Sequence, residues 1–288
     1  MEALKVGLVG ANQGFAFSGP LVAHGAEIRA VCDLDPDRLR DGGRIQRLGD
    51  CEQYTYYEEM LDNGNLDVVV LGTPQHLHAP QASLALERNL HVLSEIPAAV
   101  SVEQCQELVR ACRQSTGVYM AAENCNYMRS NMVVAELARQ GLFGEFYYAE
   151  GEYLHDLKAL NEITRWRRKW QTGIAGVTYG THSLGPILQW MAGDRVTRVC
   201  CADSACHFQD PCGDYYAQQT PVMLCRTARG ALIKIRADMV SDRPHSEINY
   251  RLQGTDGAYE AVLTGGIGPG DLCRVWLREL NQIGRAHV

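Results

Sequence analysis

The chain has 288 residues, of which 46% are hydrophobic, and its 34 acidic and 27 basic residues give a formal net charge of −7. This length predicts about two domains, and the apolar fraction suffices for sizeable cores. The acidic balance argues against nucleic acid or anionic membrane as a main partner, which leaves a small polar ligand. No segment approaches the ~18 consecutive apolar residues of a transmembrane helix.

The eleven cysteines are an odd number and form no CxxC pair. The closest approach to a metal cluster is Cys200, Cys201, Cys206 and Cys212, whose spacings lack the pairing typical of zinc sites, so no metal is predicted. We expect reduced thiols in a cytoplasmic protein. The opening "LKVGLVGA" also lacks the features of a signal peptide.

The first 120 residues alternate short apolar runs with helical patterns, which predicts a parallel sheet with right-handed crossovers. The predicted strands are Leu4–Val9, Glu27–Cys32, Asp67–Leu71, His91–Leu93 and Val118–Ala121. The predicted helices are Pro36–Leu48, Ala79–Arg88 and Val102–Arg113. Ser101 and Gln104 have the spacing of a capping box for the last of these helices.

The pattern changes after about residue 123, where longer strands with alternating polar and apolar residues predict an antiparallel sheet. One helix is expected at Met128–Gln140. The predicted strands are Glu145–Tyr153, Val196–Cys201, Pro221–Thr227, Ala231–Met239, Ile248–Gln253 and Ala258–Leu263. The sequence therefore predicts an α/β protein with a doubly wound domain over 1–122 and a second α/β domain, with an open and mainly antiparallel sheet, over 123–288.

The first strand runs into "VGLVGANQGFAF", which opens a helix as a dinucleotide-binding fingerprint does. Gly10 fits the tight turn, Asn12 occupies the place of the second glycine, and Gly14 falls one position early for the third. Asp33 ends the second strand about twenty residues further on, where a carboxylate hydrogen-bonds a ribose 2′-hydroxyl and repels a 2′-phosphate. These residues predict an NAD site, unless Asp33 and Asp35 merely cap the next helix.

Two further strand ends carry polar residues. "LGTPQHLHA" places Thr73, Pro74 and His78 in a turn that is expected to close over the cofactor, although a lone histidine there is more often structural. "LSEIPAAV" ends a strand at Glu95, at the edge of an open α/β sheet where ligands bind.

"TPQHLH" followed by "HVLSEIPAAVSVEQCQELV" resembles the Gfo/Idh/MocA oxidoreductases. In that family the strand of the second segment ends in Glu-Lys-Pro, where this chain has Glu-Ile-Pro. The resemblance covers the chain to about residue 260. It implies a Rossmann domain, with Glu95 facing the nicotinamide ribose, and a second domain whose sheet forms the substrate site and commonly pairs subunits. Two residues depart from the family pattern: Ile96 replaces its lysine, and Thr178 replaces the aspartate of a D-x-G-x-H segment.

Four segments in order resemble a narrower branch, the NAD-dependent α-N-acetylgalactosaminidases. They are "SEIPAAVSVEQC", "AAENCNYMRSNMVVAELARQGLFGE", "GEYLHDLK" and "RWRRKWQTGIAGVTYGTHSLGPI". This resemblance implies substrate-site roles for Glu123, Tyr153, Tyr179 and His182. Where the branch has a tyrosine after Arg-Pro, this chain has His245, which is expected to bind the substrate, so the substrate can differ from that of the branch.

The branch implies hydride removal from sugar C3, elimination of the C1 group after loss of the C2 proton, addition of water and return of the hydride. Tyr179 or His182 is then the proton acceptor, Tyr153 a hydroxyl contact and Glu123 a substrate anchor. Structural explanations remain open: Tyr153 lies on a predicted strand, where tyrosine often packs, and Glu123 sits where it can cap a helix.

Three functions follow as hypotheses. The first is a redox-neutral, NAD-dependent enzyme acting on a glycoside or sugar, the second a simple sugar or cyclitol dehydrogenase, and the third a catalytically silent dinucleotide- or sugar-binding regulator. A homo-oligomer is expected from the family resemblance. The final "IGRAHV", residues 283–288, resembles a translated sequencing adapter, and no function is expected there.

Overall fold

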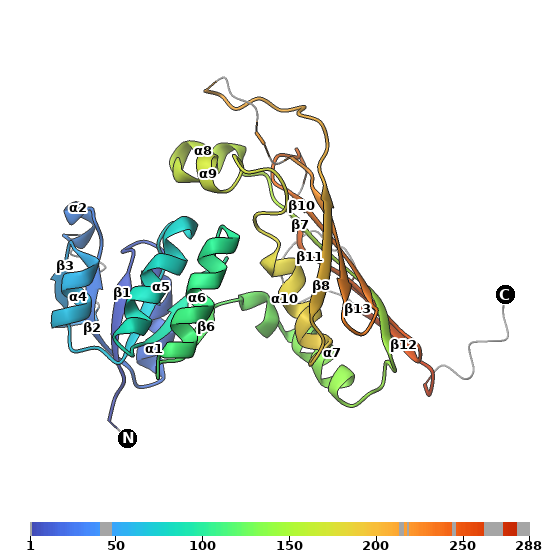
Figure 1. The fold of residues 1–288 in the computed structure, drawn as a ribbon, viewed down its shortest axis with the longest axis horizontal. Coiled ribbons are helices and arrows are strands. Elements are labelled where there is room, and N and C mark those ends of the chain that lie inside the picture. The colour runs from blue at the N-terminus through green and yellow to red at the C-terminus, as the bar shows by residue number, and fades with distance from the viewer. Residues whose placement is uncertain are drawn as a thin grey trace. The chain divides into compact units, whose positions relative to one another are not determined.

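A computed structural model describes residues 2–40, 48–212, 216–217, 219–243, 246–261 and 273–280. The chain divides into two compact units, Met1–Ala122 and Glu123–Val288, each built around its own sheet (Figure 1). The predicted His245, residues 283–288 and most of the predicted helix beyond Arg40 lie outside the described residues.

The first unit is a six-stranded sheet with the order β3-β2-β1-β4-β5-β6, and every neighbouring pair is parallel. Its strands are β1 Lys5–Val9, β2 Glu27–Cys32, β3 Glu52–Tyr54, β4 Val68–Leu71, β5 His91–Ser94 and β6 Tyr119–Ala121. This order is that of the dinucleotide-binding doubly wound fold, and it places a switch point between β1 and β4, whose crossovers run in opposite directions. The predicted Rossmann architecture is confirmed.

Both faces of this sheet are covered, which is why its two central strands are apolar over Val6–Val9 of β1 and Val68–Leu71 of β4. Two successive residues of β1 point to opposite faces of the sheet: Val9 packs with residues of α4, α5 and α6, whereas Leu8 packs with residues of α1 and α2. The helices are η1 Gly14–Phe17, α1 Ser18–Ala23, α2 Pro36–Leu39, α4 Tyr57–Asn63, η3 Gln75–Leu77, α5 His78–Glu87 and α6 Val102–Gln114.

Of the two hydrogen bonds that a capping box predicts for α6, the one to the Ser101 side chain is present. The Ser101 hydroxyl accepts a hydrogen bond from the Gln104 backbone N–H, as an N-cap does. The Gln104 side chain bonds the Val100 N–H instead of the Ser101 N–H. A second bond from the same side chain to the His76 carbonyl ties the start of α6 to η3.

The second unit is a seven-stranded sheet with the order β13-β12-β11-β7-β10-β9-β8, in which only the β7–β10 pair is parallel. The strands are β7 Phe146–Leu154, β8 Val196–Ala202, β9 Val222–Thr227, β10 Leu232–Asp238, β11 Ser246–Gly254, β12 Gly257–Ala261 and β13 Cys273–Leu277. The predicted open, mainly antiparallel sheet is confirmed.

Helices cover one face of this second sheet. They are η4 Asn124–Tyr127, α7 Arg129–Arg139 and α10 Thr181–Trp190, and α10 lies directly on β7 and β11 (Figure 1). The core between them is centred on aromatic and branched side chains such as Trp190, Tyr250 and Ile233. The Trp190 indole N–H donates to the Asn131 carbonyl and so joins α10 to α7.

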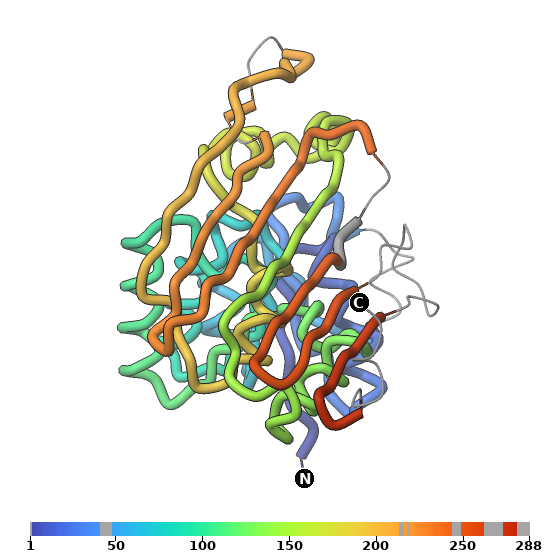
Figure 2. Tube along the Cα trace, turned by 90° about the vertical axis from the view of Figure 1, so that its right-hand side faces the viewer, coloured from blue at the N-terminus to red at the C-terminus, as the bar shows by residue number. Residues whose placement is uncertain are grey.

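The other face of the sheet has no helix over it among the described residues (Figure 2). A ladder of alternating charges runs across four of its strands, from Lys234 through Glu150 and Arg251 to Glu260. Leu224 and Trp276 are exposed there beside the charges. This face therefore mixes apolar and charged groups.

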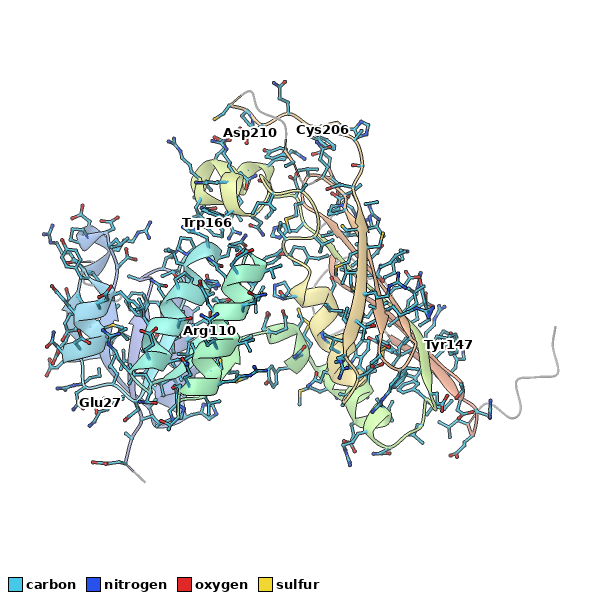
Figure 3. The ribbon with its side chains drawn as sticks, viewed as in Figure 1. Glu27, Arg110, Tyr147, Trp166, Cys206 and Asp210 are labelled. Atoms are coloured by element: carbon cyan, nitrogen blue, oxygen red, sulfur yellow. The ribbon has the colours of Figure 1, made fainter. Side chains whose placement is uncertain are left out.

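A small lobe of short helices, α8 Lys158–Ile163 and α9 Trp166–Trp170, lies beside the connection from β8 to β9 (Figure 3). The buried Asp210 of that connection accepts a hydrogen bond of 2.9 Å from Arg168 Nε of α9. Because the carboxylate is shielded from water, this ion pair fixes the lobe more firmly than an exposed pair does.

Candidate functional site

The loop after β1 is closed by glycines that leave no room for a side chain. Gly10 has a φ of +85°, and a Cβ there would lie 2.5 Å from the Gly72 carbonyl oxygen. The Gly14 N–H donates to the Gly10 carbonyl, and a Cβ on Gly72 would lie 2.4 Å from the Gly14 nitrogen. The loop is thus a tight turn that exposes backbone at the carboxyl end of β1, as a pyrophosphate site requires.

Asp33 follows β2 at the same edge of the sheet. Its Oδ2 accepts a hydrogen bond of 2.8 Å from the Ala11 N–H in the glycine loop, and its Oδ1 accepts one from the Asp35 N–H. Arg38 lies 3.5 Å from Oδ2. The alternative helix-capping role belongs to Asp35, which caps α2 through the Asp37 N–H.

Glu95 follows β5 and also reaches the glycine loop, because its Oε1 accepts a hydrogen bond of 3.0 Å from the Gln13 side chain. Its neighbour Ile96 is only 4% exposed. Where the family has a lysine, this chain therefore has a packed apolar side chain, and it lacks a cation at that position.

The other residues predicted to contact the cofactor surround the same loop. Asn12 is exposed at the turn, Thr73 donates its hydroxyl proton to Gln81, and Pro74 precedes η3. His78 is 1% exposed, and its two ring nitrogens lie 2.7 Å from the Thr73 carbonyl and 2.8 Å from the Pro97 carbonyl. The contacts of His78 thus join two loops of the unit.

These residues fit a dinucleotide. The glycine cradle supplies backbone N–H groups, Asp33 has lone pairs left for ribose hydroxyls, and Glu95 adds a second carboxylate. Gly10, Asn12 and Gly14 would hold the pyrophosphate, Asp33 the adenosine ribose and Glu95 the nicotinamide ribose.

In the second unit, His182 is the second residue of α10, and several contacts fix its backbone. The Tyr250 hydroxyl donates to the His182 carbonyl at 2.5 Å. A Cβ on Gly151 of β7 would lie 2.6 Å from the Ser183 carbonyl, so this glycine is what allows α10 to lie so close to the strand. The start of α10 is therefore rigidly placed on the sheet.

Glu123 holds the His182 ring. The distance from His182 Nδ1 to Glu123 Oε1 is 2.7 Å, and the same oxygen accepts a hydrogen bond from the Cys125 N–H. Glu123 is 6% exposed. It caps the short helix η4, rather than the helix expected over Met128–Gln140, and it also orients a histidine located 59 residues further along the chain.

Two opposing influences act on the charge of His182. Burial by itself lowers its pKa, but hydrogen bonds to Cys125 and Glu123, together with the charges of these two groups, outweigh burial and raise the pKa to about 10. A histidine that donates Nδ1–H to a carboxylate is stabilised in its charged form.

Two tyrosines pack against this histidine. The ring of Tyr179 is centred 5.1 Å from that of His182 and meets it edge to face, and the Tyr153 ring is 5.4 Å away. The two tyrosine rings are 5.3 Å apart. The structure thus brings together Glu123, Tyr153, Tyr179 and His182, all four predicted residues of the second unit that it describes.

Sequence reasoning missed three neighbours of this cluster: Cys125, His155 and Arg167. His155 Nδ1 lies 2.9 Å from the Tyr153 hydroxyl, and the largely buried Arg167 interacts electrostatically with Tyr179 and Tyr153. Burial lowers the pKa of Arg167, and the two tyrosines act in the opposite direction. The two-residue spacing of Tyr153, in β7, and His155, directly after it, was a usable signal, whereas nothing local distinguished Arg167.

Thr178 is held by a bond from its hydroxyl to the Gln171 carbonyl at 2.9 Å. This residue, which stands where the broader family has an aspartate, therefore secures the loop that carries Tyr179. The carboxylate partner of His182 is supplied from a different segment, by Glu123.

Comparison with known proteins agrees with both units. Residues 4–123 match the family described as "Oxidoreductase family, NAD-binding Rossmann fold", Gfo/Idh/MocA. Residues 127–267 match "Glycosyl hydrolase 109, C-terminal domain". The chain joins a Gfo/Idh/MocA NAD-binding domain to a glycosyl hydrolase 109 C-terminal domain. The predicted family and the predicted NAD cofactor are confirmed by these matches.

Relatives that align with most of the chain, across both units, include glycosyl hydrolase family 109 proteins. A "Glycosyl hydrolase family 109 protein" of Shewanella pealeana is 32% identical, and an "Alpha-N-acetylgalactosaminidase" of Shewanella oneidensis is 31% identical. Each alignment covers 90% of this chain and 63% of the relative. The chain thus spans less than two thirds of the length of these relatives.

Solved structures share the fold. The WlbA dehydrogenase of Bordetella pertussis, crystallised with NADH and UDP-GlcNAcA, has a TM-score of 0.76 at 24% identity, over 90% of this chain and 78% of its own. A levoglucosan dehydrogenase in complex with NADH and levoglucosan also has a TM-score of 0.76, at 22% identity, over 96% and 80%. The fold is therefore that of these dehydrogenases.

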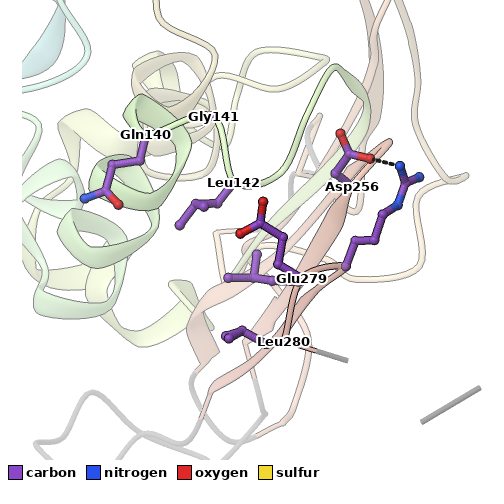
Figure 4. Close-up of a pocket in the computed structure, with 8 residues that line it drawn as sticks. Gln140, Gly141, Leu142, Asp256, Glu279 and Leu280 are labelled. Atoms are coloured by element: carbon purple, nitrogen blue, oxygen red, sulfur yellow. Dashed lines mark ion pairs between the residues drawn. The ribbon is translucent and has the colours of Figure 1, made fainter. Parts of the chain in front are cut away.

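Two cavities in the described part of the second unit have linings that include none of the cluster residues. One of about 390 Å³ is lined by the turn after α7 and by the Asp256–Arg278 ion pair (Figure 4). The other, of about 1020 Å³, is lined by residues of α7, the end of α10 and Arg229. Both mix apolar and charged groups.

Proposed function

We propose that this chain is the NAD-dependent part of an enzyme that cleaves a glycoside, with an α-N-acetylgalactosaminide as the first substrate to test, without net oxidation of the sugar. The observation that carries the proposal is the cluster in which Glu123 holds His182 against the rings of Tyr153 and Tyr179. Tyr153, Tyr179 and His182 lie in the part that matches the glycosyl hydrolase 109 C-terminal domain, and Glu123 begins the same compact unit, directly after the NAD-binding domain.

Bound NAD⁺ would accept a hydride from a sugar carbon and later return it. The protein must then move protons at the sugar hydroxyl, at the neighbouring carbon and at the leaving oxygen. We assign the proton of the sugar hydroxyl to one of the two phenols, Tyr179 or Tyr153, and the proton of the neighbouring carbon to the other, because the cationic Arg167 interacts with both phenols and favours their ionised form.

His182 has a different role in this proposal. Its Nδ1 is committed to Glu123, so only Nε2 is left for the substrate. An imidazolium held in this way is suited to donate a proton to a leaving oxygen and to accept it back from water. Glu123 then acts through His182 as a positioning residue, which differs from the substrate-anchor role that the sequence suggested.

His155 completes the set as the partner of Tyr153. Its Nδ1 lies within hydrogen-bond distance of the phenol oxygen and can take up the phenol proton. The reference pKa of tyrosine is about 10, so a tyrosine that acts as a base must first lose its phenol proton. His155 is the group that accepts this proton from Tyr153.

The test is cleavage of p-nitrophenyl α-N-acetylgalactosaminide by the purified chain. We expect p-nitrophenol release that requires NAD⁺ in only catalytic amount and leaves no net NADH. Steady NADH production from a free sugar would instead establish a simple sugar dehydrogenase. Binding of NAD and sugar without turnover, unaffected by Tyr179→Phe, would establish a silent binding protein.

We also propose a cytoplasmic homo-oligomer. All eleven cysteines are free thiols, as a reducing compartment requires. The helix-free face of the second sheet, with Leu224 and Trp276 exposed among charges, is the surface we assign to subunit pairing. Light scattering of the chain and of Trp276→Glu tests the pairing: we expect a dimer that the variant breaks, and a monomeric wild type contradicts it.

Among the described helices, none is both long and apolar enough to cross a bilayer.

A further inference from the structure

Three groups that ligate transition metals lie close together in the second unit. They are the Glu123 carboxylate, the Cys125 thiol and the His182 imidazole, each of which offers a ligand atom within 4.8 Å of those of the other two, and the ring atom beside Glu123 is Nδ1. Glu123 and Cys125 are 6% and 2% exposed, so the groups meet in a largely dry environment. Carboxylate, thiolate and imidazole together are the donor set that Zn²⁺ prefers.

A second observation points to a ligand at the same place. Glu123 Oε2 is buried and has no hydrogen-bond partner among the described residues, although Oε1 of the same carboxylate has two. The Asn126 side-chain oxygen, from the same short helix, is also buried without a partner in that part of the chain. A buried oxygen left unbonded is costly, and binding a cation is one way to satisfy it.

We propose that Glu123, Cys125 and His182 bind a thiophilic divalent cation of the Zn²⁺ type, with the metal on His182 Nδ1. Zinc-ligand distances of about 2.0–2.3 Å place tetrahedral ligand atoms roughly 3.3–3.6 Å apart. The contact between His182 Nδ1 and Glu123 Oε1 is 2.7 Å, so it must open by several tenths of an ångström. Asn126 or water is available as the fourth ligand.

Binding displaces two protons, one from His182 Nδ1 and one from the Cys125 thiol, and involves no oxidation or reduction. With the metal on Nδ1, the ring is a neutral imidazole whose Nε2–H is a much weaker acid than that of an imidazolium, so it no longer donates a proton to the leaving oxygen. If the proposed function is correct, the metal therefore inhibits the enzyme reversibly. That consequence rests on the proposed function, whereas the binding itself does not.

Exposed thiols are the competing explanation for any metal binding by this chain. Cys200, Cys201, Cys206 and Cys212 are all exposed. A metal held there would be solvated and would not depend on Glu123 or His182. The experiment must therefore report which thiolate binds.

Co²⁺ is the probe, because a thiolate ligand gives it a charge-transfer band and tetrahedral geometry gives it intense visible bands. The full chain is reduced, freed of metal, and titrated with CoCl₂ in wild-type, Cys125→Ser and Cys201→Ser forms. We expect one equivalent to bind with a charge-transfer band, Zn²⁺ to abolish it, Cys125→Ser to lose it, and Cys201→Ser to keep it.

No charge-transfer band in the wild type, or one that Cys125→Ser leaves undiminished, overturns the metal site. Since Cys125→Ser risks misfolding, His182→Gln is titrated as well: it must weaken Co²⁺ binding at least tenfold, and unchanged binding also overturns the site. Activity is measured separately. Binding to Cys125 and His182 without inhibition keeps the metal site and contradicts the proposed role of His182.

Discussion

The two units form their sites from different parts of the chain. In the first unit, the backbone of one glycine loop and the carboxylates at two strand ends form the site, all at one edge of a parallel sheet. In the second unit, Glu123 and Tyr153, from two segments distant in the sequence, meet His182 and the nearby Tyr179. The first arrangement suits a cofactor that many enzymes share. In the proposed function, the second supplies the groups that move protons.

The comparison also shows where each unit departs from its broader family. The first unit has lost a cation, since Ile96 is buried in the place of a lysine. The second lacks an aspartate at Thr178 and supplies a carboxylate from Glu123 instead. Proton transfer is therefore assigned wholly to the second unit, and the predictions below test that division.

The largest effect is expected from His182→Ala. Removing a general acid–base group costs about 10²- to 10⁴-fold in rate, so glycoside cleavage should fall by that factor while NAD⁺ affinity stays unchanged. Turnover and NAD⁺ fluorescence titration measure the two quantities. The matched control is His24→Ala, at an exposed histidine of the first unit, which should leave both unchanged. Equal loss of NAD⁺ binding would contradict the division between the units.

The reverse separation is expected from Asp33→Ser. Hydrogen bonds to a charged acceptor contribute about 1.5–3 kcal/mol, so NAD⁺ affinity should fall roughly 10- to 100-fold. NADP⁺ should lose less, because Arg38, which then keeps only its exposed pair with Asp35, can meet a 2′-phosphate. Dissociation constants for both nucleotides measure this change in preference. In the double variant Asp33→Ser/Arg38→Ala, the ratio of the two dissociation constants should no longer shift toward NADP⁺. An unchanged preference would show that Asp33 only supports the loop.

A smaller effect, about tenfold, is expected from Glu123→Gln. The amide oxygen still accepts the Nδ1–H bond but lacks the charge that favours the imidazolium. A positioning residue lowers kcat with KM nearly unchanged, whereas a substrate anchor raises KM. Steady-state kinetics separate the two, and Glu123→Ala should be clearly worse than Glu123→Gln. A raised KM with normal kcat would restore the anchor role.

The smallest effect concerns stability in the first unit. Burial, followed by the negative charges of Asp33 and Glu59, raises the pKa of Cys32 from 9.0 to about 12. The folded chain therefore favours the neutral thiol, and stability is lost as pH rises from 9 toward 12, because the unfolded chain ionises first. Urea unfolding of Cys32→Ala should show a shallower loss over that range, and Cys200→Ala should match the wild type. Identical slopes in all three would refute the assignment.

Most of the fold was predictable because its strands carry clear apolar patterns. All five strands predicted in the first unit are present, but β3 Glu52–Tyr54 was missed because it is short and largely exposed. Helix α4 was missed as well, since only Met60 and Leu61 of it are buried. In the second unit, β13 Cys273–Leu277 has four exposed residues out of five and gives no alternation to detect.

The candidate sites divide in the same way. Gly10, Asp33 and Glu95 were found because each has a fixed place relative to a strand end. The bond between Glu123 and His182 was not foreseen, since it joins residues 59 positions apart. Likewise, no local pattern shows that Cys125 faces His182 or that Arg167 lies beside two tyrosines. Such contacts depend on how α10 and η4 pack on the sheet.

The central claim is that glycoside cleavage proceeds through proton removal at the sugar C2, and deuterium incorporation tests it most directly. The chain is incubated in D₂O with NAD⁺ and an α-N-acetylgalactosaminide, and the released sugar is examined by NMR. We predict deuterium at C2 of the product, with none in Tyr179→Phe/His182→Ala, which should not turn over. Cleavage with the C2 hydrogen fully retained would show direct displacement and contradict the account.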